Sequence, residues 1–136
     1  MKRDMVTNGL TAEAIAAVAV SAMHQWQHAD QNHRDTEREI SAERISQLET
    51  EASYYTSTTP EAALYQLGVA RSHADTLVAN YVDDLEGVNL YRNLERLLIQ
   101  ITRYIEATSG VTREHAGLLY YSDPRNDGHV FVEASR

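Results

Sequence analysis

Apolar residues recur every three to four positions over much of the chain, which is the period of an amphipathic α-helix. The clearest helix start is at Thr59-Pro60, because threonine is a good N-cap and proline suits the first helical position. We expect this helix to end at Gly87. Its predicted buried stripe consists of Ala63, Leu67, Ala70, Ala74, Val78, Tyr81 and Leu85.

A second amphipathic stretch follows almost directly. Asn89 can cap it, and Ser109-Gly110 can end it. Because the connection between the two helices is very short, they should form an antiparallel hairpin. The predicted buried stripe of the second helix consists of Leu90, Leu94, Leu97, Leu98, Ile101, Ile105 and Thr108.

The segment from a Thr11 cap to Tyr55 contains no glycine or proline, yet its apolar residues do not form one continuous face. The apolar residues from Ile15 to Ile40 and those from Ile45 onward form two clusters about 80° apart on a helical wheel, which indicates a break. We therefore expect two helices, with Ser41 able to cap the second. One long helix that pairs with a second subunit is the alternative.

After Gly110, Thr112 can cap a short helix as far as Tyr121, and residues 122–128 form a dense turn signal. Residues 129–133 alternate like a strand, as a hairpin or an extended tail would. The predicted fold is an all-α antiparallel helical bundle of three long helices or four helices. It would comprise one domain over residues 1–121, with a short C-terminal helix, and a turn and extended tail over 122–136.

The amino-acid composition excludes several classes of protein function. A length of 136 residues favours a single domain, and the absence of cysteine excludes disulfide scaffolds and thiolate metal sites. A net charge of −8 argues against direct nucleic-acid binding. No signal peptide or membrane span is evident, so we expect a cytoplasmic protein. Eleven of the 12 basic residues are arginine, which indicates a GC-rich coding genome and a bacterial or phage source.

Two histidine arrangements could carry chemistry. His24 and His28 have the spacing at which two imidazoles share a metal, but Gln25 replaces the glutamate that a zinc protease needs as general base. His73 lies midway along a helix of the predicted bundle, where histidine phosphotransfer domains carry their phosphoryl acceptor. Such domains usually have Lys and Gly three and four residues later, where this chain has Thr76 and Leu77. Phosphotransfer and metal binding are therefore the alternatives.

Our main hypothesis is a small, acidic, non-enzymatic protein that acts through protein–protein interaction and self-associates as a dimer. We identify no catalytic residue and no cofactor, and no phosphate-binding or nucleophile motif occurs. The predicted self-association residues lie in an alanine-rich helix that is apolar on nearly every side: Ile15, Val18, Ala22 and Trp26. A partner with a basic surface would contact two groups of acidic residues, Glu37, Glu39, Glu43 and Glu49, and Asp83, Asp84 and Glu86.

Overall fold

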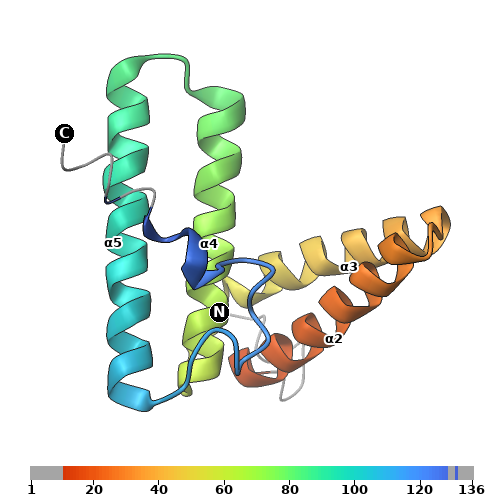
Figure 1. Ribbon diagram of the computed structural model, residues 1–136. Helices are drawn as coiled ribbons and strands as arrows, with labels where there is room; N and C mark the ends of the chain where they lie inside the picture. Colours follow the sequence, from red (N-terminus) through yellow and green to blue (C-terminus); the bar gives the residue numbers. More distant parts are fainter. Residues whose placement is uncertain (1–10, 129–130, 132–136) are drawn as a thin grey trace. The chain divides into compact units, whose positions relative to one another are not determined.

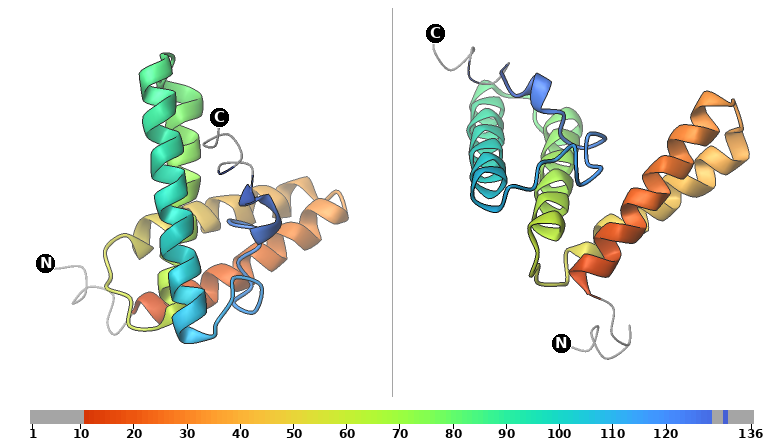
Figure 2. Two further views of the ribbon diagram at one scale, coloured as in Figure 1. Left: turned by 60° about the vertical axis from the view of Figure 1, so that its left-hand side comes forward. Right: turned by 60° about the horizontal axis from the view of Figure 1, so that its bottom comes forward.

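The computed structural model describes residues 11–128 and 131, and over these residues it contains four α-helices, one short 3₁₀ helix and no strand (Figure 1). The predicted all-α class is confirmed, with α2 packed beside α3 and α4 beside α5 in the views of Figures 1 and 2. The elements are α2 (Ala12–Gln31), α3 (Asp35–Ala52), α4 (Pro60–Tyr81), α5 (Leu85–Ser109) and η1 (Pro124–Asn126).

The chain divides into two compact units, residues 1–66 and 67–136. The boundary lies inside α4, so this helix contributes its first turns to the first unit and the rest to the second. The predicted division into a domain over residues 1–121 and a tail over 122–136 stays a prediction.

Local capping signals determine α2. Its start is the predicted one, because the Ala14 amide donates to Thr11 Oγ1 at 3.1 Å. At its end His33 takes a left-handed φ of 56°. The His33 amide donates to the Asp30 carbonyl and the Arg34 amide to the Ala29 carbonyl, which is the hydrogen-bond pattern of a Schellman cap.

The expected break in the segment 11–55 is therefore present, and the alternative of one long helix is not observed. The second helix begins at Asp35, earlier than the predicted cap at Ser41. Ser41 is buried on α3 and does not cap it. The Schellman turn explains this difference, because the chain re-enters helical geometry as soon as the turn is complete.

The interior of the first unit is built mainly from small side chains. Alanine dominates the buried side of α2, and α3 adds only a few buried residues, as expected for a helix with a polar sequence. Small side chains let two helices approach closely, which fits the tight pairing of α2 with α3. The residues buried on these helices are Ala12, Ile15, Ala16, Ala19, Ala22, Met23, Ala29, Ser41, Ile45 and Ala52.

The loop before α4 is fastened on both sides. The Ala62 amide donates to Thr59 Oγ1 at 3.3 Å, which confirms the predicted start at Thr59-Pro60. Gln66 donates to the Ala52 and Tyr55 carbonyls at 3.0 and 2.7 Å. The Glu13 carboxylate accepts from the Thr58 amide at 2.8 Å. This hydrogen bond lowers the pKa of Glu13 below its ordinary value of 4.5.

In the second unit α4 and α5 form the predicted antiparallel hairpin (Figure 1). The turn differs from the prediction, because α4 ends at Tyr81 and α5 begins at Leu85, capped by Asp84. The Asp84 carboxylate accepts from the Gly87 amide at 2.7 Å. Gly87 therefore lies in the first turn of α5 and does not end α4. A Cβ at Gly87 would lie 2.4 Å from Val82 Cγ1, so the glycine permits a close approach.

The chain after α5 differs more from the prediction. Gly110 ends α5 as expected, in the left-handed region at φ 75°. The expected helix from Thr112 to Tyr121 is reduced to turns, because Gly117 is also left-handed at φ 76° and a helix cannot continue through it. The 3₁₀ helix η1 lies instead within the predicted turn over residues 122–128. Most of the predicted strand at 129–133 lies outside the described residues.

Candidate interaction surface

The exposed side of α5 is apolar. Five large side chains lie there at alternating steps of four and three residues, the spacing of a coiled-coil seam. Each is between 46 and 68% exposed. Most of them had been predicted to form the buried stripe, and that prediction is wrong for Leu90, Leu94, Leu97 and Ile101. We call this set the α5 face: Leu90, Leu94, Leu97, Ile101 and Tyr104.

The α5 face is free of charge along both flanks. At 100° per residue, the charged residues between Arg92 and Glu106 all fall within an arc of about 100° on the other side of the helix. The helix as a whole has three arginines and three glutamates, so it is neutral in a chain of net charge −8. The positions that flank the face are uncharged: Tyr91, Asn93, Leu98, Gln100, Ile105 and Ala107.

The opposite side of α5 contacts the rest of the second unit. Ile99 and Thr102 are buried there. Glu95 pairs with Arg71 of α4 at 3.4 Å, and Tyr91 donates a hydrogen bond to Asp75 of α4. Burial and this hydrogen bond raise the pKa of Tyr91 above its ordinary value. Because these contacts use the polar side of α5, its apolar side remains uncovered.

A buried ion network holds the C-terminal segment against this polar side. Arg113 donates to both Asp127 oxygens, at 3.1 and 3.0 Å, and to both Glu106 oxygens, each at 3.1 Å. The side chains of Arg113 and Asp127 are each only 3% exposed. Burial lowers the pKa of Arg113, but the hydrogen bonds that it donates to Asp127 and Glu106 outweigh burial and raise that pKa. Arg71 joins the network through Ser122 at 2.8 Å.

Within the network each cation has an anionic partner, which is the condition for burying charge. Arg103 also lies 3.5 Å from Asp127, and its guanidinium stacks 4.9 Å from the ring centre of Phe131. We interpret the network as a clamp on the C-terminal segment, because its positive and negative charges balance and leave none for a ligand.

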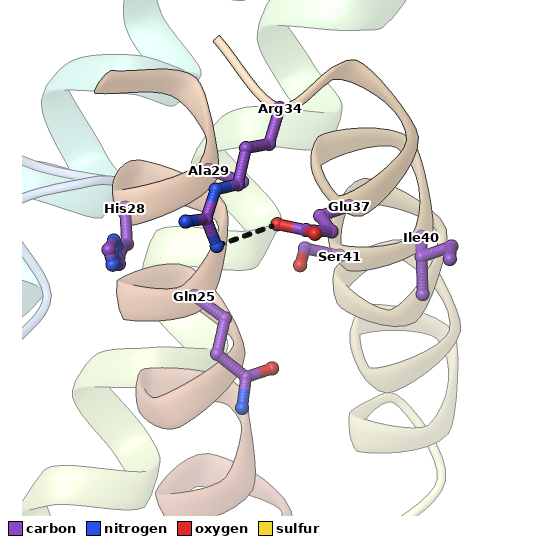
Figure 3. Close-up of a pocket in the computed structure, with 7 residues that line it drawn as sticks. All are labelled: Gln25, His28, Ala29, Arg34, Glu37, Ile40 and Ser41. Atoms are coloured by element: carbon purple, nitrogen blue, oxygen red, sulfur yellow. Dashed lines mark hydrogen bonds and ion pairs between the residues drawn. The ribbon is translucent and has the colours of Figure 1, made fainter. Parts of the chain in front are cut away.

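The first unit contains a pocket of about 310 Å³ between α2 and α3 (Figure 3). Its charged residues, Arg34 and Glu37, pair with each other at 3.4 Å across the opening. The volume is at the lower limit for small-molecule sites, and no charged side chain in the lining is left to select a ligand. The lining residues are Gln25, His28, Ala29, Arg34, Glu37, Ile40 and Ser41.

The predicted self-association residues of α2 do not form one exposed surface. Ile15 and Ala22 are each 1% exposed, so they belong to the interior of the first unit and cannot contact a second subunit in this conformation. Val18 is exposed and Trp26 is half-buried. The apolar character of this helix reflects burial within its own unit, and that explains why the prediction was wrong for Ile15 and Ala22.

The two predicted groups of acidic residues lie on different elements. Glu37, Glu39 and Glu43 are exposed on α3, and Glu49 is half-buried. The other group, Asp83, Asp84 and Glu86, lies at the turn between α4 and α5, where all three side chains are exposed. This second group therefore gives one end of the α4–α5 hairpin a concentrated negative charge.

Among the described residues no contact supports the two histidine alternatives, which are metal binding by His24 and His28 and phosphotransfer by His73. His24 and His28 are exposed on α2, and His28 Nδ1 lies 3.0 Å from the side-chain nitrogen Nδ2 of Asn32. No group of three metal-binding side chains occurs among the described residues. His73 is exposed on α4, followed by Thr76, whose hydroxyl donates to the Ser72 carbonyl.

Sequence reasoning missed Tyr104 and the whole Arg113 network. The signal for Tyr104 was present, since it continues the steps of four and three from Leu90 with uncharged neighbours on both sides. The ion network gave no such signal, because its members are spread from Arg71 to Asp127 without a local pattern.

None of the helices in the described part of the chain is both long and apolar enough to span a membrane. Comparisons of the chain with protein-family models, with curated proteins and with solved structures found no match.

Proposed function

We propose that this protein is a non-enzymatic interaction protein that self-associates as a dimer through the α5 face. The observation that carries the proposal is the exposure of five large apolar side chains at coiled-coil spacing on a neutral helix. Exposed apolar patches of this kind mark contact sites more often than solvated surface. We also expect the protein to act in the cytoplasm, as its composition suggests.

The size of the α5 face fits a moderate affinity. Burying the exposed parts of five side chains on each of two copies would contribute about 12 kcal/mol, at about 2 kcal/mol for each fully buried side chain. Association costs between about 4 and 15 kcal/mol in lost freedom. The remainder is at most about 8 kcal/mol, which corresponds to a dissociation constant of about 1 μM as the tightest value and excludes nanomolar affinity.

The first unit has no comparable surface. Its exposed large apolar residues are Val18, Ile40 and Tyr54, which are scattered and do not follow helical spacing. The second unit also exposes Leu77, Tyr81 and Leu85, although Tyr81 and Leu85 had been predicted to be buried, and this shorter group adjoins Asp83, Asp84 and Glu86 in the sequence. We therefore take another α5 face as the occupant of the α5 face. A second copy also meets no net charge on this neutral helix, whereas most of the chain is acidic.

Light scattering after size-exclusion chromatography tests the proposal. We expect a dimer mass at high concentration, which falls toward the monomer mass on dilution through the micromolar range. A monomer mass at every concentration would overturn self-association. The assay uses the full chain and needs no knowledge of any other partner.

A further inference from the structure

We propose that two copies of this chain pair their α5 helices antiparallel, with the two Leu97 side chains facing each other at the two-fold axis. This inference rests on the proposed function and adds the geometry of the dimer to it. It follows from how charge is distributed along the hairpin and where the α5 face is centred.

The α5 face is centred on Leu97. From Leu97 the face extends to Leu90 in one direction and to Tyr104 in the other, by the same number of residues. An antiparallel pair of such faces is in register when Leu97 meets the partner's Leu97 and Leu90 meets the partner's Tyr104. Leu90, Leu97 and Tyr104 then each have a large apolar residue opposite them, while Leu94 and Ile101 lie at the levels of the partner helix's polar positions 100 and 93.

Charge selects this orientation over the parallel one. Asp83, Asp84 and Glu86 concentrate three exposed carboxylates at the beginning of α5. In a parallel pair the two acidic ends would lie about 10 Å apart, which is a typical distance between packed helix axes. That distance is about one Debye length at moderate salt, so the repulsion would be only partly screened.

In an antiparallel pair the two acidic ends are far apart. Leu85 is twelve residues from Leu97, so the starts of the two α5 helices would be separated by about 36 Å at 1.5 Å per residue. Each acidic end would then lie near the C-terminal end of the partner helix, where Thr108, Ser109 and Gly110 carry no charge. The repulsion between the copies is therefore almost completely screened.

The contacts that α5 makes with its own unit lie on the side that faces away from the α5 face. The C-terminal segment is held there by Arg113 and Asp127, and the contacts to α4 are there as well. A second α5 helix can therefore reach the face in either direction without displacing either element. The charges at the helix ends therefore determine the orientation of the pair.

Disulfide trapping tests the orientation directly, because the chain contains no cysteine. The variants are Leu97→Cys, Leu90→Cys and Tyr104→Cys in the full chain, each oxidised alone and the last two also as an equal mixture. A disulfide needs Cα atoms within about 7 Å. Ile40→Cys, at a comparably exposed apolar position of the first unit, controls for random collision.

We expect Leu97→Cys to form a disulfide-linked dimer alone. We expect Leu90→Cys and Tyr104→Cys to form one only when mixed, because two copies of residue 90 would be about 21 Å apart. Intact mass identifies the mixed species. Linkage of Leu90→Cys to itself and of Tyr104→Cys to itself would show parallel pairing and overturn the inference.

The outcomes separate this inference from the proposed function. If light scattering shows a dimer and the trapping pattern is parallel, only the antiparallel arrangement is overturned. If it shows a dimer but no pair links above the Ile40→Cys control, the dimer uses another surface, and the α5 face is overturned as the contact together with the arrangement. If the chain is monomeric at every concentration, the proposed function and the antiparallel arrangement are both overturned. A dimer with the mixed-pair pattern supports both.

Discussion

Replacing Leu97 with glutamate should dissociate the dimer without unfolding the chain. Leu97 is 60% exposed in the single chain, so a charged side chain is tolerated there before association. In the dimer the remaining Leu97 surface of both copies would be buried. Losing that burial twice amounts to about 2.5 kcal/mol, at about 2 kcal/mol for each fully buried leucine.

An energy of this size corresponds to a dissociation constant raised by about 60-fold. The value is a lower bound, because the antiparallel arrangement would place two glutamates opposite each other with little water between them. Sedimentation equilibrium over a wide concentration range measures the constant for the natural chain and for Leu97→Glu. Circular dichroism confirms that the helix content of the variant is unchanged.

The matched control is Ile40→Glu, which places the same charge at an apolar residue with 63% exposure in the first unit. We expect it to change the association energy by less than about 0.5 kcal/mol. Leu97→Met keeps the volume and should retain the dimer. The reasoning is refuted if Leu97→Glu associates as well as the natural chain, or if Ile40→Glu dissociates it equally.

Three further predictions concern stability. Arg113→Met should destabilise the chain by about 3–5 kcal/mol in urea unfolding, because it removes the closest cation from the buried Asp127 carboxylate, which Arg71 and Arg103 approach only to 3.6 and 3.5 Å. Gly87→Ala should cost about 1–3 kcal/mol in the same assay, because the added Cβ would lie 2.4 Å from Val82. Glu13→Gln should lower the melting temperature at neutral pH. It should also make the melting temperature less dependent on pH in the acidic range. The Glu13 pKa is lowered by folding, so its stabilisation is present at neutral pH and is lost as pH falls below about 4.

Each of these predictions has its own control. Adding Asp127→Leu to Arg113→Met should recover part of the lost stability, and a double variant worse than the single one would contradict the clamp. Gly128→Ala introduces a Cβ with no atom within 4 Å and should be nearly neutral. For Glu13→Gln, an acid dependence identical to that of the natural chain would show that its carboxylate makes no such contribution.

Helix ends with local capping signals could be predicted from the sequence. Thr11, Thr59 and Gly110 each act within one helical turn, and each occupies the predicted position. Gly87 shows where this reasoning fails. Glycine can end a helix or permit close packing, and only the position of Val82 distinguishes the two roles.

The α5 face shows a different limit. The period of Leu90, Leu94, Leu97 and Ile101 correctly predicts one apolar side of a helix, but it does not say which element covers that side. In the structure α5 meets α4 through its other side, with polar pairs such as Arg71 and Glu95. Pairs separated so far in the sequence have no local signature, and for that reason the side that contacts α4 was not predicted.

The position of the unit boundary inside α4 limits how the chain can be divided. A cut after Gln66 would leave the first unit with only about two turns of this helix, fewer than an isolated helix needs to persist. Gln66 itself fastens the preceding loop and would lie at the frayed end. The two units therefore cannot be exchanged as independent modules by recombination at this point.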